Sequence, residues 1–361
     1  MMEQFAFNSA FEHMMEKDHL TTVVILAHIN PDGDAAGSVM SLAHYIRSNY
    51  PKVRVLPYLS EKLDKGPKQK VLKDGIFHPF EMPEMGEDPY AVIVCDTATM
   101  ERIAGKELYD GAAASLVLDH HASNEGYGDV NYTKISESCS ENIFYMLDRE
   151  CLEHAAAYKD KDCPGHTETC EPEKCMRHTV ASHNGWGAAE YIYLGMVHDT
   201  DGFDRADAGT LEAAASLLHM GVNHKELLKT LKTETFDDVT KRTALLTGAV
   251  RVMDGKVAYV YVDRQESMQK DIRYEDIHPI SGRLRDCEDI ELGMTFYEEE
   301  EGLWRCSFRS DGQWINVNEL LNPFHGGGHA GAAGLRTKTD QPKQLVQDIL
   351  ERVNLLRKNK D

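Results

Sequence analysis

The sequence contains no apolar run long enough to span a bilayer. Its first segment mixes Glu, Lys, Asp and His with apolar residues, which is not the pattern of a signal peptide. It also contains no internal repeat. These absences predict a cytoplasmic protein that does not enter a membrane.

Basic residues are scarce, because 39 Lys and Arg stand against 60 Asp and Glu and give a formal net charge of −21. Binding to long nucleic acids relies on many cationic contacts with phosphate, so this balance argues against long duplex nucleic acid as a partner. Bound metal ions and a few arginines would have to attract an anionic substrate locally. The composition therefore favours a short or small phosphorylated substrate.

The length of 361 residues fits two domains, and a hydrophobic content of 42% is enough to fill both cores. Eight cysteines are present without an export signal. A chain of this size does not need disulfides to fold, so we expect reduced thiols or metal ligands.

The first strong signal is an apolar stretch, residues 23–27, which is typical of a short buried strand and ends before Asn30-Pro31. The loop that follows carries His28, Asp32 and Asp34. Two carboxylates and an imidazole converge only if their charge is compensated, so a divalent cation is the obvious candidate ligand. The alternative is a polar turn in which an aspartate caps the next helix and His28 is incidental.

The pattern then continues as a helix over 35–49 and a strand over 53–59, which begins a parallel α/β sheet. Two further strands, 91–95 and 115–118, end directly in acids or histidines. Ligands of open parallel sheets bind beyond the carboxyl ends of the strands. We therefore expect these polar clusters to share one crevice.

The rest of the chain changes character twice. Residues 155–185 are polar and aperiodic and are interpreted as an insertion in the first domain, preceded by a helix over 141–154. From residue 251 the pattern favours strands, with an acidic hairpin tip at 298–302. The sequence predicts further helices at 188–197, 211–220, 224–231 and 341–356, and further strands at 257–262, 290–297 and 304–308.

Four carboxylates and two imidazoles are too many ligands for one ion and suit two ions roughly 3.5 to 4 Å apart that share one carboxylate. The mixed nitrogen and oxygen set favours Mn²⁺, with Mg²⁺, Co²⁺ or Zn²⁺ as substitutes. Such a pair can activate water for attack on phosphorus. The six candidate ligands are His28, Asp32, Asp34, Asp96, His120 and Asp199.

The sequence resembles the DHH family of phosphoesterases, because five of the family's motifs occur in it in the same order. Residues 28–34 read HINPDGD, and residues 96–97, 119–121 and 198–203 read DT, DHH and HDTDGF. Residues 326–329 read GGGH, the signature of a DHHA1 domain. Size and layout resemble the subgroup of bifunctional oligoribonucleases and PAP phosphatases, where PAP is 3′-phosphoadenosine 5′-phosphate.

The resemblance implies catalytic roles for Asp96, as the bridging carboxylate, and for His121, beside the scissile phosphate. Asp119 then either orients an imidazole or acts directly. The implied ligands are His28, Asp32 and Asp96 for the first ion, and Asp34, Asp96, His120 and Asp199 for the second.

The glycine run has a physical role of its own, since residues without Cβ let backbone N–H groups approach an anion closely. Gly327, Gly328 and His329 are therefore candidate substrate-binding residues. Arg309 resembles the family arginine that holds a substrate phosphate or base. Weaker candidates for the same role are Arg283 and Arg285.

The insertion is dense in soft ligands and departs from the family pattern. Their spacing is compatible with a structural zinc but matches no standard zinc finger, so a surface loop is the competing interpretation. The residues concerned are Cys151, His154, Cys163, His166, Cys170, Cys175, His178 and His183.

The predicted fold class is α/β in two domains, with an active site in the cleft between them. A parallel-sheet DHH domain spans 1–235, a helical linker spans 236–250, and a smaller α/β DHHA1 domain with a mixed sheet spans 251–361. A homodimer is left open.

The predicted function is a Mn²⁺-dependent phosphohydrolase that cleaves short single-stranded RNA to nucleoside monophosphates and dephosphorylates PAP. Linear or cyclic dinucleotides are alternative substrates of the same chemistry. A pyrophosphatase or polyphosphatase is the second alternative, although those relatives are not expected to carry the GGGH segment. Two further alternatives are a single-strand DNA exonuclease and a nucleotide-sensing protein without catalysis.

Overall fold

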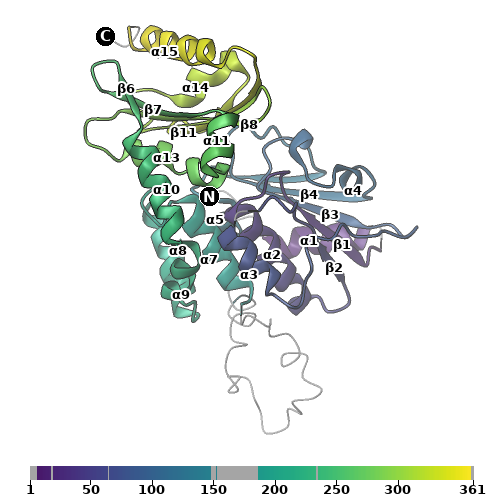
Figure 1. The fold of residues 1–361 in the computed structure, drawn as a ribbon. Coiled ribbons are helices and arrows are strands. Elements are labelled where there is room, and N and C mark those ends of the chain that lie inside the picture. Colours follow the sequence, from purple (N-terminus) through teal and green to yellow (C-terminus); the bar gives the residue numbers. More distant parts are fainter. Residues whose placement is uncertain are drawn as a thin grey trace. The chain divides into compact units, whose positions relative to one another are not determined.

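The computed structural model describes residues 6–17, 19–63, 65–147, 152, 186–232 and 235–358. The chain divides into two compact units, Met1–Thr233 and Glu234–Asp361 (Figure 1). No helix among the described residues is long and apolar enough to cross a membrane.

The first unit is built on a five-stranded sheet in which every pair of neighbouring strands is parallel. This confirms the predicted parallel sheet. Apolar residues alternate between its two buried faces: Val23 and Ile25 contact one hydrophobic core, and Val24 and Leu26 contact the other. The strands, in spatial order, are β2 (Arg54–Pro57), β1 (Thr22–Leu26), β3 (Ala91–Cys95), β4 (Ala114–Asp119) and β5 (Val130–Thr133).

Two helices of this unit, α2 (Gly33–Asn49) and α7 (Ala188–Asp199), pack side by side (Figure 1). A Cβ atom at Gly37 would lie 2.5 Å from the backbone oxygen of Tyr191, so the two backbones approach closely only because residue 37 is glycine. The other helices are α1 (Phe7–Lys17), α3 (Lys65–Leu72), the 3-10 turn η1 (Met100–Arg102), α4 (Lys106–Asp110), α5 (Cys139–Met146), α8 (Ala208–His219) and α9 (His224–Lys232).

The structure changes the bounds of two predicted helices in this unit and adds a strand. The helix expected over 35–49 begins at Gly33, because the Asp32 side chain caps it. Of the helix expected over 141–154, the structure shows α5, which begins earlier, at Cys139, and ends where Leu147 adopts an extended backbone; most of 148–154 lies outside the described residues. Strand β5 was missed because its sequence, VNYT, is only half apolar and lies at the edge of the sheet.

The second unit contains a mixed six-stranded sheet, as predicted, in which only β7 and β8 run parallel. The acidic run at 298–302 is not all hairpin tip: β8 continues to Glu300, and Gly302 with φ of +71° makes the turn. The strands, in spatial order, are β10 (Gly327–Gly328), β11 (Ala332–Lys338), β9 (Leu303–Ser310), β8 (Leu292–Glu300), β7 (Val257–Val262) and β6 (Val250–Val252).

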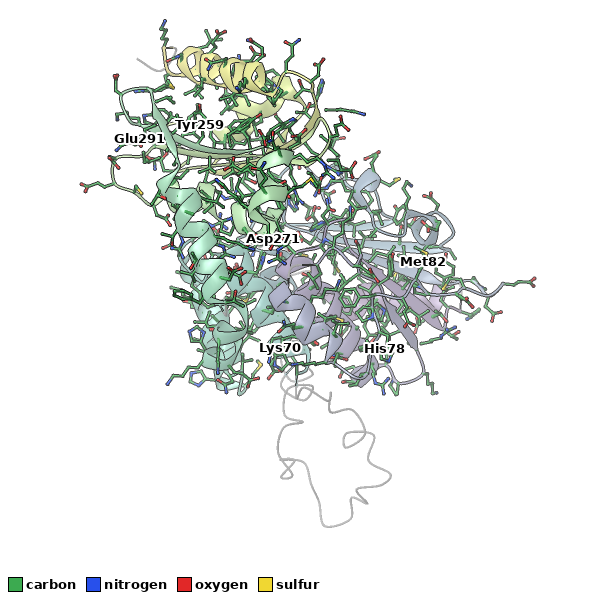
Figure 2. The ribbon with its side chains drawn as sticks, in the orientation of Figure 1. Lys70, His78, Met82, Tyr259, Asp271 and Glu291 are labelled. Carbon is green, nitrogen blue, oxygen red and sulfur yellow. The ribbon has the colours of Figure 1, made fainter. Side chains whose placement is uncertain are left out.

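Helix α10 (Phe236–Thr247) occupies most of the stretch predicted as a linker and belongs to the second unit. Lys241 Nζ lies 2.8 Å from Asp271 Oδ2 and links this helix to the rest of the unit. Figure 2 labels Asp271. The remaining helices are α11 (Arg264–Lys270), α12 (Tyr274–Ile277), α13 (Ile280–Arg285), α14 (Val317–Leu321), the 3-10 turn η3 (Asn322–Phe324) and α15 (Pro342–Lys358).

Candidate metal centre

The site is built at the carboxyl ends of three neighbouring strands. Because β1, β3 and β4 are adjacent in the sheet, the residues that follow them, His28, Asp96 and His120, meet at one edge. Asp96 has a left-handed backbone with φ of +49°, a conformation that aspartate tolerates better than most residues. Backbone strain of this kind is concentrated at functional sites.

The amino-terminal end of α2 supplies two more carboxylates. Asp32 Oδ1 accepts the N–H groups of Asp34, at 2.9 Å, and Ala35, at 3.1 Å. The carboxylate of Asp34 accepts the N–H groups of Cys139, at 2.7 Å, and Ser140, at 2.9 Å, at the first turn of α5. Both side chains are thus held by backbone donors at helix amino termini.

Helix α7 ends in Asp199 and closes the site from another side. A Cβ atom at Gly195 would lie 1.9 Å from Ser140 Oγ and 2.6 Å from Asp34 Oδ1. Any side chain at position 195 would therefore displace the Asp34 carboxylate. A glycine here is what lets α7 approach α5 and α2 closely enough for Asp199 to reach the site.

The six predicted ligands fall into two groups that Asp96 links. In each group the ligand atoms lie within 4.8 Å of one another. Asp96 Oδ2 lies 3.5 Å from His28 Nε2, whereas Asp96 Oδ1 lies 3.3 Å from His120 Nε2. The two oxygens of one carboxylate therefore face different groups. The groups are His28, Asp32 and Asp96, and Asp34, His120 and Asp199.

The carboxyls of the site differ in acidity. Burial raises the pKa of Asp34 to about 6, and the nearby Asp96 adds to the rise. Burial also raises the pKa of Asp199 well above its ordinary value, with a further contribution from Asp34. Burial alone would raise the pKa of Asp96 too, but contacts with His120 and His28 outweigh it and lower this pKa.

Divalent cations fit this set of donors. Oxygen and nitrogen ligands together suit Mn²⁺ and other borderline ions, and close buried carboxylates need compensating positive charge. His28 turns Nε2 towards Asp96 Oδ2, at 3.5 Å, so a cation beside this carboxylate would lie within reach of the ring.

These pKa shifts predict how pH changes the stability of the metal-free protein. The pKa of Asp34 rises from 3.8 to about 6, so its stabilising contribution is complete below pH 3.8 and lost as pH rises through 6. The pKa of His120 rises from 6.5 to about 11, because Asp96 outweighs its burial, so its contribution is lost between those values. Both effects destabilise the metal-free protein as pH increases.

We therefore expect Tm in EDTA to fall as pH rises from 5 to 9, and the increase in Tm produced by Mn²⁺ to grow, because the ions bind the deprotonated groups. Thermal melts with and without Mn²⁺ measure this. Asp34→Asn should flatten the lower part of the metal-free profile. A metal-free Tm that climbs through this range would contradict the assignment.

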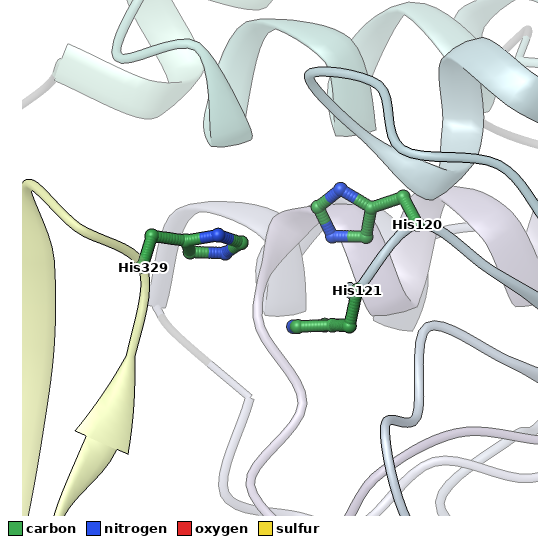
Figure 3. A group of neighbouring side chains, drawn as sticks. All are labelled: His120, His121 and His329. Atoms are coloured by element: carbon green, nitrogen blue, oxygen red, sulfur yellow. The ribbon is translucent and has the colours of Figure 1, made fainter. Parts of the chain in front are cut away.

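His121 and Asp119 form a pair beside the two groups. His121 Nδ1 lies 2.8 Å from Asp119 Oδ1, and the buried Asp119 also accepts the backbone N–H of His120. The rings of His120 and His121 are in contact, with centroids 4.5 Å apart (Figure 3). Of the two predicted roles of Asp119, this geometry favours orienting an imidazole.

Sequence reasoning missed Asn124. Its Nδ2 donates to Asp119 Oδ2 at 2.7 Å and to the Thr97 carbonyl at 3.2 Å, so it joins the loops after β3 and β4. An asparagine in a polar loop gives no such signal in the sequence. Only the neighbouring DHH motif could have drawn attention to it.

The sequence predicts free backbone N–H donors in the glycine run, residues 326–329, whereas the structure pairs three of these donors. The N–H of Gly326 donates to Leu321, that of Gly328 to Asn318 Oδ1, and that of His329 to Ala332. These three donors are therefore already used within the unit.

Gly328 and Gly327 are glycines for different reasons. Gly328 has φ of +149°, and a Cβ atom there would lie 2.5 Å from the oxygen of Ala332. At Gly327 a Cβ atom would meet, among the described residues, only Asn318 Oδ1, at an ordinary van der Waals distance of 3.6 Å. The fold thus leaves room at Gly327, and His329 follows it on an exposed segment.

Arg309 lies beside this segment, because it pairs with Ala332 where β9 meets β11. The weaker candidates Arg283 and Arg285 lie on α13 instead, where Arg285 contacts Asp286 at 3.0 Å. The four described cysteines, Cys95, Cys139, Cys287 and Cys306, are free thiols, as expected. The predicted zinc ligands Cys163, His166, Cys170, Cys175 and His178 lie outside the described residues.

Comparison with known proteins agrees with this arrangement. Residues 22–167 match the DHH family, N-terminal domain, and residues 254–358 match the DHHA1 domain. The bifunctional oligoribonuclease and PAP phosphatase NrnA of Bacillus subtilis is 26% identical over 338 residues, 91% of this chain and 93% of that protein. The protein of the same name from Mycoplasma pneumoniae is 26% identical over 340 residues, 92% of each chain.

A solved structure of an exopolyphosphatase-related protein from Bacteroides fragilis shares the fold. Its TM-score is 0.71 at 19% identity, and the match covers 97% of each chain. One matched domain lies in each unit of the structure. The family resemblance of the motifs is confirmed, and the chain belongs to the DHH/DHHA1 family of phosphoesterases.

Proposed function

We propose that this phosphoesterase uses two divalent ions, of which Mn²⁺ is the preferred one. With them it hydrolyses short oligoribonucleotides to nucleoside monophosphates and dephosphorylates PAP. The proposal depends above all on Asp96, because the two oxygens of its carboxylate face two separate groups of ligands. The names of the relatives from B. subtilis and M. pneumoniae support this choice of substrates.

In this proposal Asp96 is the carboxylate common to both ions. Ions held in such a pair lower the pKa of water and neutralise charge on phosphate oxygens. The backbone donors on Asp32 and Asp34 fix the directions in which their remaining lone pairs point. The first ion would bind His28, Asp32 and Asp96, and the second Asp34, Asp96, His120 and Asp199.

His121 is the group that handles a proton. The Asp119 carboxylate accepts a hydrogen bond from Nδ1–H of His121, so Nε2 is the nitrogen that exchanges a proton with the substrate. In the protonated ring Nε2–H would donate to a leaving oxygen or to a phosphate oxygen. The side chain of His121 is 28% exposed, so a substrate can reach it. Asp119, fixed by Asn124, keeps the ring in one tautomer and orientation.

The second unit would supply the substrate contacts through His329, Arg309 and the open position at Gly327. Because the N–H groups of Gly328 and His329 are used internally, the run would act by letting a substrate approach the backbone rather than by donating an array of hydrogen bonds. The net charge of −21 favours substrates with few phosphates.

Linear or cyclic dinucleotides remain alternative substrates, since their hydrolysis uses the same groups. The structure from B. fragilis carries the words exopolyphosphatase-related, but at 19% identity it bears on the fold alone. A nucleotide-sensing protein is disfavoured because every ligand position holds a competent residue.

One assay panel tests these choices: short RNA, PAP, linear and cyclic dinucleotides, pyrophosphate and polyphosphate, each with Mn²⁺. Turnover of trinucleotides and PAP above the others is the expected result. Turnover confined to pyrophosphate or polyphosphate would replace the proposal by its alternative.

His329→Ala should lower kcat/KM for a trinucleotide by about ten- to a hundredfold, the cost of one charge-assisted phosphate contact of about 1.5 to 3 kcal/mol. Mn²⁺ affinity, measured by calorimetry, should stay near that of the wild type. His325→Asn is the matched control, since His325 is exposed in the same segment and asparagine tolerates its φ of +60°. Loss of Mn²⁺ binding in His329→Ala would contradict this role.

A further inference from the structure

The proposed function gives no task to His198, the histidine that begins the HDTDGF motif. His198 lies in the last turn of α7, next to Asp199. A ring nitrogen of His198 and carboxylate oxygens of Asp32 and Asp199 lie within 4.8 Å of one another. This is a third group of ligands, and it shares only its carboxylates with the two groups already described.

The fold is shaped around the His198 ring. A Cβ atom at Gly33 would lie 2.4 Å from Cγ, 2.5 Å from Cδ2 and 2.6 Å from Cβ of His198. The absence of a side chain at Gly33 therefore lets the imidazole lie against the first turn of α2. Since Asp32 and Asp34 flank Gly33, the ring is held at the loop that carries two proposed ligands.

Both carboxylates have an oxygen to offer. Asp32 uses Oδ1 to cap α2, so its Oδ2 would be shared between the first ion and this one. Asp199 has Oδ2 3.5 Å from His120 Nε2, which leaves Oδ1. All three side chains of the group are partly exposed, so an ion can enter from solvent. Two atoms bound to one ion at about 2.0 to 2.2 Å each would lie closer together than 4.8 Å, so the spacing of this group is compatible with a shared ion.

We propose that Asp32, His198 and Asp199 form a binding site for a third divalent cation. This site lies beside the two ion sites of the proposed function, and the inference rests on that function. One imidazole and two carboxylates suit Mn²⁺, Co²⁺ or Zn²⁺ better than Mg²⁺. Four carboxylates already balance two divalent ions, so the third ion adds net positive charge. It therefore binds more weakly than the other two, and it strengthens the attraction of the site for an anionic substrate.

Equilibrium dialysis with Mn²⁺, followed by elemental analysis, tests the proposal. The wild type should bind three ions per chain at saturation, the last with at least about tenfold lower affinity. His198→Gln should bind two, with the affinities of the first two changed by less than about threefold. The control His219→Gln, at an exposed histidine in the last turn of α8, should bind three.

Two further measurements separate a ligand from a residue that only packs. Gly33→Ala keeps every ligand but pushes the ring aside, so it should also lose the third ion. Titration of the wild type with Co²⁺ needs no variant, and visible absorbance should rise in three increments. Absorbance that saturates after two equivalents, or three Mn²⁺ ions in His198→Gln, would overturn the third position and leave the two-ion function intact. A wild type that binds no Mn²⁺ would overturn both.

Discussion

Treatment with EDTA should reduce hydrolysis of a trinucleotide to background, at least about a hundredfold, and added Mn²⁺ should restore it. Without ions the burial that raises the pKa of Asp34 and Asp199 favours their protonated forms, so the site loses the charges on which the reaction depends. Initial rates at a fixed substrate concentration, measured before and after dialysis against Mn²⁺, check this.

The choice of ion supplies the control. Ca²⁺ prefers six to eight oxygen ligands, whereas this site includes the imidazoles of His28 and His120, so Ca²⁺ should restore little activity. Full activity in EDTA would refute the two-ion mechanism. Restoration by Ca²⁺ as good as that by Mn²⁺ would refute the assignment of the imidazoles as ligands.

Asp96→Asn should be the most damaging single change among the six ligands, with a loss of about 10³-fold or more in kcat/KM. The carboxylate of Asp96 faces both ligand groups, so its charge is lost to two ions at once. Asparagine keeps the size of the side chain and tolerates the φ of +49°, which alanine does not. The variant therefore tests charge rather than backbone strain.

Kinetics and Mn²⁺ dialysis on the same preparation measure this loss. Asp271→Asn is a matched control, because Asp271 is an exposed aspartate with the same φ of +49°, and it should keep full activity. If Asp96→Asn loses less activity than Asp32→Asn, the shared carboxylate is assigned to the wrong residue.

The sequence by itself determined much of the first unit. Unbroken apolar runs such as AVIVC mark strands buried on both faces, and the polar residue that ends each run marks the edge of the sheet where ligands gather. The order of the motifs added the family. These signals are local, since each depends on neighbours within a few residues along the chain.

Only the tertiary structure decided how those side chains are used. The two oxygens of Asp96 face different groups because β3 lies between β1 and β4, and Asn124 joins two loops that are far apart in the sequence. Gly195 and Gly33 look like ordinary helix glycines until Asp34 and His198 are placed against them. The glycine run pointed to free N–H donors, yet packing on α14 and β11 uses three of them. Each of these features depends on contacts across the fold, which composition and spacing do not specify.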